Sequence, residues 1–351
     1  MNRKNIGRRD FFKIAGGALS ISAISYYLGL RDKPDAVVPD GYPDYVDGGI
    51  GLPVFRGPYL QKDVNLAAFL YNADINTLTA LCDQTLNQVP SSPFKYIPLM
   101  ANVILVYADM LVSSLDERDT QVGLIPETEV SFWVLTLAMQ KTSTGEIAHH
   151  LAWFLPTLLV DEANAIATGR EVYGFNKQAG TFEKPQDIQS PSFTANVLGF
   201  KQFSQTAIAQ KERLLELHLS SSEGTQSSWN DWSTAKDYFV GELLKNIRPD
   251  LGASVVGFVA QALVNHIPLV FLKQLRSAST TEKAIYQKIV EAPLQIENFY
   301  SGSMLTQSYE LNISHLESHP VAEKLGLQLK QSTNLAAWLK VDFILDSGIE
   351  Y

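Results

Sequence analysis

One lysine, Lys177, stands where the sequence favours covalent chemistry. It closes an aromatic, glycine-punctuated stretch, residues 169–177, which follows an apolar run at residues 153–160. Burying an ammonium ion in such surroundings costs free energy, and the cost falls if the amine gives up its proton. A neutral amine is a nucleophile that can form a Schiff base with a carbonyl compound. We therefore predict that Lys177 is a nucleophile; the plain alternative is a surface lysine whose stem covers apolar neighbours.

Other polar groups near this stretch have more than one interpretation. Tyr173 either lines a cavity around the lysine or packs in the core. Arg170 and Glu171 are interpreted as a structural ion pair, with substrate-carboxylate binding by the arginine as the alternative. His149 and His150 are neighbours on an expected strand, where they would face opposite ways and could not chelate one ion. The sequence therefore predicts no metal site.

The elements that must position Lys177 are mainly strands. Residues 130–139 and 148–160 are strand-like and flank a Thr-Ser-Thr-Gly turn, which predicts a hairpin. After the hairpin, Asp161 is expected to cap a short helix that ends at Gly169. Strand signals continue to residues 338–345. We predict an α+β fold class built on an antiparallel β core.

Composition and charge exclude several functions. The chain has 351 residues, of which 46% are hydrophobic and 19% charged, as in a globular protein. Five basic residues and one acidic residue give residues 1–30 a charge of +4, which leaves −13 for the remainder of a chain whose net charge is −9. So acidic a body argues against nucleic acid as a partner. The single cysteine, Cys82, excludes an intrachain disulfide.

Residues 1–30 resemble a twin-arginine export signal. An arginine pair at positions 8 and 9 precedes two phenylalanines, a lysine and a mildly hydrophobic run. The pattern predicts a partner, the twin-arginine export machinery, and an exported, periplasmic protein, tethered to the membrane if the segment is not cleaved. A chance arginine pair before a short anchor is the alternative. We expect residues 31–50 to be a linker and residues 51–351 to be a single domain, with an insertion around 204–257.

The stretch that ends at Lys177 resembles the core motif of the acetoacetate decarboxylase family. Residues 155–161 are similar to the family's Pro-Tyr-x-x-x-Asp, and an alanine-rich helix, Gly-Arg-Glu and Gly-Phe-Asn-Lys follow in order. Residues 126–130 resemble its Pro-Tyr-x-Glu segment. Its C-terminal part is similar to residues 283–293, 318–320 and 341–346. The resemblance, over residues 52–351, implies a closed antiparallel β barrel with flanking helices, and a homo-oligomer.

The resemblance also implies a mechanism. Lys177 would attack the carbonyl group of a small β-keto or other oxo acid, the imine would act as an electron sink, and no cofactor would be needed. Glu129 matches the family's proton-transferring carboxyl group, with Glu127 an equally near substitute. Arg56 matches an N-terminal arginine that binds the substrate carboxylate in the family, and Tyr173 would line the cavity.

The sequence departs from the family pattern at one informative position. Gln178 stands where the family has a second lysine, so an adjacent ammonium that would help Lys177 lose its proton is absent. Related proteins of this fold use the lysine for aldol or dehydration reactions. The sequence thus predicts an exported Schiff-base lyase of the acetoacetate decarboxylase-like class. The alternative is a non-catalytic binding protein for small molecules on the same barrel.

Overall fold

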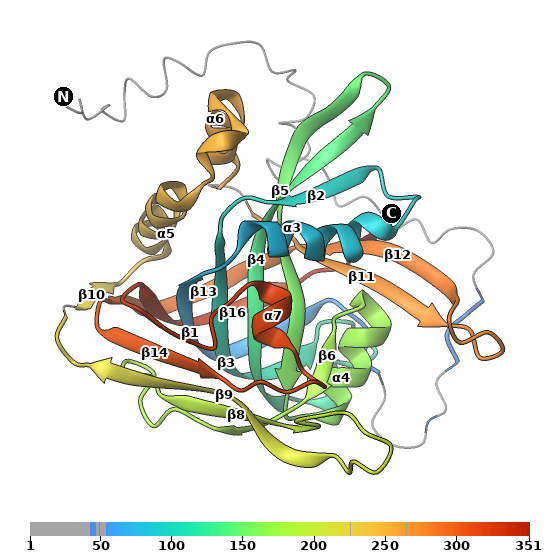
Figure 1. Cartoon of the computed structure of the whole chain (residues 1–351), viewed down its shortest axis with the longest axis horizontal. Helices are drawn as coiled ribbons and strands as arrows, with labels where there is room; N and C mark the ends of the chain where they lie inside the picture. The colour runs from blue at the N-terminus through green and yellow to red at the C-terminus, as the bar shows by residue number, and fades with distance from the viewer. Residues whose placement is uncertain (1–42, 47–48, 50–53, 225, 264–265) are drawn as a thin grey trace.

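The computed structural model describes residues 43–46, 49, 54–224, 226–263 and 266–351. The predicted export segment, residues 1–30, and most of the predicted linker, residues 31–50, lie outside the described residues. Figure 1 shows two sheets with helices at their margins. The described part of the chain is α+β, as the sequence predicts.

The larger sheet holds twelve of the strands in the described residues. Its main path runs, in order, through β10 (Gln226–Trp229), β13 (Leu294–Leu305), β16 (Ala336–Leu345), β1 (Tyr59–Asn72), β3 (Asn102–Ser114), β4 (Ile125–Thr142), β5 (Gly145–Val160), β11 (Leu269–Arg276), β12 (Ala284–Ala292) and β17 (Ile349–Glu350). Off this path, β2 (Phe94–Pro98) pairs with β4, and β6 (Lys177–Ala179) pairs with β5.

The smaller sheet packs its inner face against the larger one. Its strand order is β15 (Lys330–Thr333), β14 (Ser308–Ile313), β9 (Gln210–Ser221), β8 (Phe193–Gly199) and β7 (Thr181–Glu183). Phe69 and Tyr107 of the larger sheet meet Phe193 and Tyr309 of the smaller one, with ring centroids 5.0–6.3 Å apart. The main hydrophobic core therefore lies between the sheets.

The prediction of a closed barrel is wrong. Among the described strands, the path of the larger sheet starts at β10, which pairs with β13, and stops at β17, which pairs with β12. A barrel requires the first and last strands to exchange hydrogen bonds, and these two do not. Alternation of apolar and polar residues shows which face of a strand is buried, but it does not show which strand pairs with which.

The hairpin that the sequence predicts is confirmed, and it is the frame of the lysine segment. β4 and β5 pair antiparallel along their length, and the Thr142 hydroxyl donates to the carbonyl oxygen of Gly145 across the turn. After β5 the chain forms α4 (Ala163–Thr168) and a π-helical turn, η3 (Gly169–Tyr173). It then returns as β6, parallel to β5, with Lys177 opposite Leu158.

Two details of this connection differ from the sequence-based expectation. The cap of α4 is Glu162, whose side chain accepts the N–H of Ala165, while Asp161 accepts the N–H of Thr128 on β4. The helix also does not end at Gly169, because the π turn continues it as far as Gly174, which has a left-handed φ of 83°. The competing hydrogen bond to β4 explains why Asp161 is not the cap.

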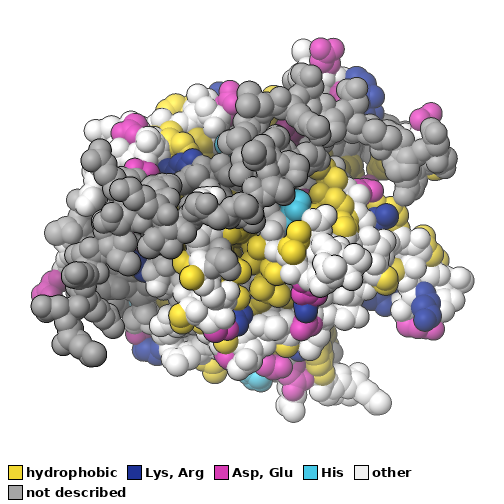
Figure 2. All heavy atoms as spheres, turned by 90° about the horizontal axis from the view of Figure 1, so that it is seen from above, with side chains coloured by type: hydrophobic (Ala, Val, Ile, Leu, Met, Phe, Trp, Pro, Cys, Tyr) yellow, Lys and Arg dark blue, Asp and Glu magenta, His cyan; other side chains and the backbone are white. Residues whose placement is uncertain are grey.

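The remaining helices lie at the margins of the sheets. They are α3 (Ile75–Gln84), α5 (Trp232–Asn246), α6 (Ala253–Ala262) and α7 (Val321–Leu325), with 3₁₀ turns at η1 (Leu86–Gln88), η2 (Thr120–Val122) and η4 (Pro249–Leu251). In the described residues, no helix has both the length and the apolar character needed to span a membrane. On the face in Figure 2, acidic and basic side chains are interspersed, and hydrophobic ones gather near the centre.

Candidate active site

A cavity of about 70 Å³ lies between β4, β5, β6 and the α4–η3 connection, and Lys177 lines it. This volume holds several water molecules or a small carbonyl compound. Its walls are largely apolar and belong to a second hydrophobic cluster, distinct from the core between the sheets. The apolar lining includes Phe55, Tyr59, Trp133, Leu155, Tyr173 and Phe175.

Lys177 is buried, with 9% of its surface exposed. The parallel pairing of β6 with β5 fixes its backbone, and the guanidinium of Arg170 donates to the carbonyl oxygen of Lys177 at 3.3 Å. Asn176, at the position where the family has proline, donates from its amide to the carbonyl oxygen of Pro156 at 2.8 Å. Arg170 and Glu171 therefore have separate partners instead of the predicted pairing with each other. Arg170 donates to the backbone of Lys177, and Glu171 accepts from the hydroxyl of Tyr45.

The arm of Lys177 passes close over Gly169. A Cβ atom built on Gly169 would lie 2.8 Å from Cδ and 3.0 Å from Cε of Lys177, closer than van der Waals contact. The backbone of Gly169 is right-handed helical, with φ −64°, so glycine is not required there for its dihedral angles. The absence of a side chain at this position is what lets the lysine reach the cavity.

Two glutamates meet the lysine from β4. Glu127 and Glu129 are two residues apart, so both project from the same face of the strand, and both are buried and line the cavity. Thr128 between them points away and is held from the other side: its N–H donates to Asp161 and its hydroxyl donates to Asp109, each at 2.8 Å. These two bonds fix the direction in which the glutamates point.

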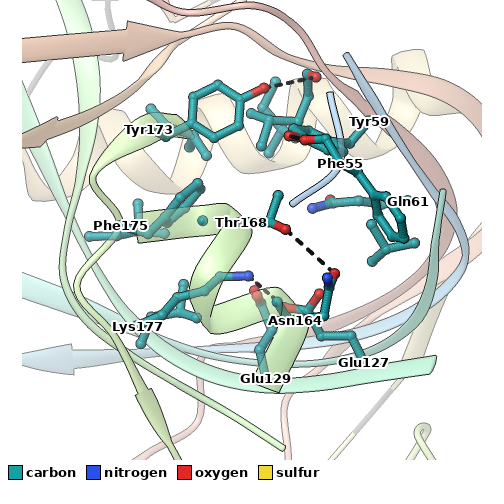
Figure 3. Close-up of a pocket in the computed structure, with 18 of the residues that line it drawn as sticks. Phe55, Tyr59, Gln61, Glu127, Glu129, Asn164, Thr168, Tyr173, Phe175 and Lys177 are labelled. Carbon is teal, nitrogen blue, oxygen red and sulfur yellow. Dashed lines mark hydrogen bonds and ion pairs between the residues drawn. The ribbon is translucent and has the colours of Figure 1, made fainter. Parts of the chain in front are cut away.

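The lysine and the two carboxyl groups form a compact charged cluster (Figure 3). Nζ of Lys177 donates to Oε1 of Glu127 at 2.6 Å, and it lies 5.4 Å from the ring centroid of Phe175. Burial raises the pKa of Glu129 from 4.5 to about 7; the charge of Lys177 opposes the rise and that of Glu127 adds to it. Near neutral pH, Glu129 therefore exists in both protonation states, as a proton donor and acceptor must.

The contacts of Lys177 modify the sequence-based hypothesis. The carboxylate of Glu127 and the face of Phe175 both stabilise the protonated amine. A neutral nucleophile must therefore arise by transfer of the proton to a carboxylate within the cavity. Gln178 is next to Lys177 on β6 and so projects from the opposite face of the strand. A second lysine at position 178 would point away from the cavity.

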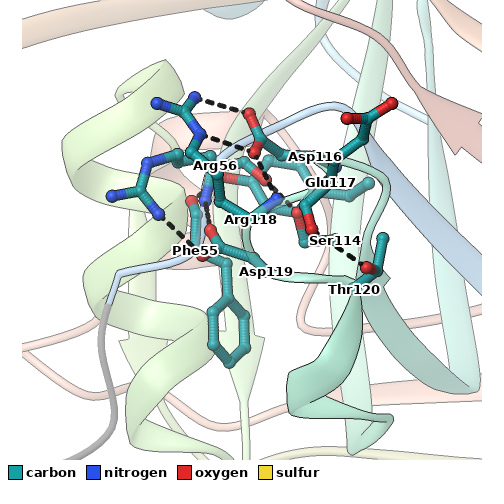
Figure 4. Close-up of polar contacts among 9 residues, drawn as sticks. Phe55, Arg56, Ser114, Asp116, Glu117, Arg118, Asp119 and Thr120 are labelled. Carbon is teal, nitrogen blue, oxygen red and sulfur yellow. Dashed lines mark hydrogen bonds and ion pairs between the residues drawn. The ribbon is translucent and has the colours of Figure 1, made fainter.

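The other residues predicted for the site are placed differently. The ring of Tyr173 lines the cavity, and its hydroxyl donates to the carbonyl oxygen of Asp346 at 2.9 Å. Burial raises the pKa of this hydroxyl, which keeps it a donor. Arg56 does not line the cavity, and its guanidinium pairs with Asp119 at 2.6 Å. In Figure 4 the ring of Phe55, which does line the cavity, points away from the guanidinium of Arg56.

Three neutral polar residues of the cavity were not predicted. Asn164 and Thr168 lie four residues apart on α4 and so share one face, and the Thr168 hydroxyl lies 3.4 Å from the amide oxygen of Asn164. Gln61 comes from β1, and its amide points into the cavity in Figure 3. The helical spacing of Asn164 and Thr168 could have indicated from the sequence that they share one face. No comparable pattern in the sequence points to Gln61.

The two histidines lie elsewhere, and the prediction that they face apart is wrong. Nδ1 of His149 is 2.7 Å from Nδ1 of His150, because a bulge in the β4–β5 pairing interrupts the alternation at His149. Nε2 of His150 is bonded to the buried Glu291 at 2.6 Å. In the part of the chain that the structure describes, no group of three or more metal-binding side chains is placed to hold an ion.

We predict that Gly169→Ala impairs the chemistry of Lys177 while the protein still folds. The added methyl group would crowd the flexible part of the lysine side chain and make an ordinary contact with Cδ2 of Phe175 at 3.4 Å, so the amine would move rather than the backbone. A displacement of about 1 Å can reduce the rate about a hundredfold. The measurement is Schiff-base formation together with thermal unfolding, and Gly241→Ala, which meets nothing within 4 Å, is the control. Equal reactivity of the two variants would contradict the prediction.

Comparison with known proteins shows the fold. No family model and no curated protein matches the sequence. The structure is similar to acetoacetate decarboxylase from Legionella pneumophila subsp. pneumophila str. Philadelphia 1, at 12% identity and a TM-score of 0.51 over 92% of this chain and 96% of that one. It is also similar to an acetoacetate decarboxylase-like enzyme from Sphingomonas wittichii RW1, at 10% identity and a TM-score of 0.52 over 89% and 99% of the two chains.

A third similar structure is the enduracididine biosynthesis enzyme MppR. It was solved with the condensation product of pyruvate and imidazole 4-carboxaldehyde, and it matches at 13% identity and a TM-score of 0.51 over 88% and 98% of the two chains. At these identities the three likenesses establish an acetoacetate decarboxylase-like fold.

Proposed function

We propose that this protein is a Schiff-base enzyme of the acetoacetate decarboxylase-like class, a carbon–carbon lyase that binds a carbonyl compound covalently through Lys177. The observation that carries the proposal is the buried Lys177, 2.6 Å from Glu127 in an apolar cavity that also contains Glu129. A nucleophile, a proton acceptor and a second carboxyl group with a pKa near 7 are the groups that imine chemistry requires. The shared fold supports the proposal.

The geometry supports a sequence of proton transfers. Lys177 gives its proton to Glu127, and the neutral amine adds to the substrate carbonyl carbon. Glu129 protonates the carbinolamine oxygen, which leaves as water and gives a protonated imine. A bond on the adjacent carbon then breaks, and its electron pair moves into an enamine. Protonation of the enamine carbon and addition of water release the product and restore the amine.

Reductive trapping tests the proposal. The protein is incubated with a panel of aldehydes, ketones and oxo acids in the presence of borohydride, and the modified peptide is then mapped by mass spectrometry. We expect one reduced adduct, on Lys177. The exposed Lys184, which pairs with Asp109 at the surface, is an internal control for non-specific reaction.

A non-catalytic binding protein is the second candidate, and one observation favours it. Nζ of Lys177 lies 2.6 Å from Oε1 of Glu127, and an amine that keeps its proton in such an ion pair is not a nucleophile. In that case the cavity would bind a small carbonyl compound without a covalent bond. Binding detected by calorimetry in the absence of any borohydride adduct would select this second function.

We also propose export and self-association, for which the sequence provides the support. The twin-arginine motif in residues 1–30 would direct the protein to the periplasm, and the family resemblance favours a homo-oligomer. Replacing the arginine pair by two lysines should retain the protein in the cytoplasmic fraction of the cell. Light scattering would measure the subunit number, and a monomer at micromolar concentration would contradict self-association.

A further inference from the structure

The charges in the cavity restrict what can bind there. Among the described residues that line it, Lys177 is the only cation, and Glu127 and Glu129 are two acidic groups. Glu127 already neutralises the lysine at 2.6 Å. A substrate carboxylate would therefore enter a cavity that contains a paired cation and a further acidic group. An unpaired anion in an apolar, buried site is costly.

Arg170, which follows the cavity residue Gly169, does not remedy this, because it does not line the cavity and its guanidinium donates to the carbonyl oxygen of Lys177 at 3.3 Å. Arg56 and Arg118 do not remedy it either. Arg56 follows the cavity residue Phe55, but its guanidinium bonds to Asp119 at 2.6 Å, and its side chain is 40% exposed. Arg118 binds Asp116 through two nitrogens, at 2.7 and 2.8 Å. Figure 4 shows both guanidinium groups engaged with these aspartates. Their charges are compensated outside the cavity.

The remaining polar groups of the cavity suit an uncharged molecule. Gln61, Asn164 and Thr168 carry amide and hydroxyl groups that donate to and accept from hydroxyl and carbonyl oxygens. In Figure 3 the amide of Gln61 points into the cavity, and the hydroxyl of Thr168 points towards Asn164. A carbonyl compound bound at Lys177 could place a second oxygen there.

We propose that the substrate of Lys177 is an uncharged aldehyde or ketone with a second neutral oxygen function, and not an oxo acid. The inference rests on the proposed function, because it concerns the compound that forms the imine. It replaces the oxo acid that the family resemblance implies.

An uncharged substrate also selects the reaction. It carries no carboxylate to lose as CO₂, so the bond that breaks is a C–H or C–C bond next to the imine carbon. A carboxylate of the cavity removes the α-proton, or the β-hydroxyl proton of an aldol, and the electron pair enters the enamine. In the second case a neutral aldehyde leaves. The reaction class is thus aldol cleavage or its reversal, or the related loss of a β-hydroxyl group as water.

Pairs of compounds that differ mainly in charge test the inference. Hydroxyacetone is compared with pyruvate, and 4-hydroxybutan-2-one with acetoacetate, in borohydride trapping on the full-length protein at pH 7.5. We expect the neutral member of each pair to give about ten times more Lys177 adduct than the acid, or more. Equal or greater trapping of the acids would overturn the inference and leave the proposed function intact. No adduct with any of the four would overturn both.

Two variants should shift this preference in a known direction. Gln61→Arg places a cation in the cavity and should raise the ratio of acid adduct to neutral adduct about tenfold. Glu129→Gln, which is nearly isosteric, removes an acidic group and should raise the same ratio even if the arginine variant does not fold. A ratio that stays constant in a folded Glu129→Gln protein would count against the charge argument.

Discussion

Lys177→Met is expected to abolish the borohydride adduct and to lower the stability of the protein at alkaline pH. Methionine retains the apolar stem but removes the ammonium, so Glu127 loses its partner at 2.6 Å. Breaking a buried ion pair by removing one partner costs on the order of 3–5 kcal/mol of unfolding free energy. Surface ion pairs contribute far less, so the large effect is specific to a buried lysine.

The loss of stability should depend on pH in a defined direction. Without Lys177, the charge that opposes the raised pKa of Glu129 is gone, so this carboxyl group takes up its proton in the folded protein at still higher pH. A carboxyl group whose pKa is raised by folding destabilises the protein as pH rises above its unfolded value. The deficit should therefore be small near pH 5 and largest above pH 8.

Urea unfolding at pH 5 and pH 8 measures this deficit. Lys184→Met is the matched control, because Lys184 makes an exposed ion pair with Asp109 at 2.8 Å and should cost less than about 1 kcal/mol at either pH. A Lys177→Met protein as stable as the wild type at pH 8 would show that the Lys177–Glu127 pair does not form in solution. An adduct that persists in the variant would place the nucleophile elsewhere.

Glu129→Gln is expected to make the folded protein more stable at pH 8 and to slow the reaction. In the wild type, burial raises the pKa of Glu129 from 4.5 to about 7. The folded state therefore binds this proton more tightly than the unfolded state does. The amount by which Glu129 destabilises the folded protein grows as pH rises from 4.5 to 7 and is constant above pH 7. Glutamine has no charge to bury, so the gain should be on the order of 1–3 kcal/mol at pH 8 and vanish towards pH 4.5.

The kinetic effect of the same change has the opposite sign. Removing a group that transfers protons in the transition state typically slows a reaction by about 10²–10⁴-fold. Hydrogen–deuterium exchange at the α-carbon of a ketone, followed by NMR, isolates this step. Glu127→Gln is the control, and its effect on stability should have the opposite sign. It leaves the Lys177 ammonium unpaired and should destabilise the protein at pH 7. If Glu129→Gln destabilises the protein at pH 8, the carboxyl group is not buried as described.

The sequence predicts the β4–β5 hairpin because the information is local. Two strand-like runs flank a short turn that contains Gly145, and neighbouring strands joined in this way pair with each other. The cap of α3 is local in the same sense, because Asp74 accepts the N–H groups of Asn76 and Thr77, two and three residues further along the chain. The position of Lys177 at the end of its segment, and the spacing of Glu127 and Glu129, could likewise be read from neighbouring residues.

What could not be predicted depends on contacts between distant residues. The edges of the larger sheet, β10 and β17, remain apart because of where each strand finds a partner, and alternation does not encode this. Asp161 binds Thr128, 33 positions earlier, instead of capping α4. The choice of Glu127 as the direct partner of Lys177 depends on how far β6 advances along β5, a register set by tertiary packing.

Gly169 shows that a working site can depend on an atom that is missing. None of the groups that would form or break bonds belongs to it. Yet a Cβ atom at this position would lie only 2.8 Å from Cδ of Lys177, so the missing side chain decides whether the lysine side chain can reach the cavity. A relative with every acid, base and nucleophile intact but with alanine at this position would be counted as an enzyme in a survey of functional residues. In a redesign of this cavity, the helix that faces Lys177 therefore matters as much as the lysine itself, since a single methyl group at position 169 would be enough to displace the amine.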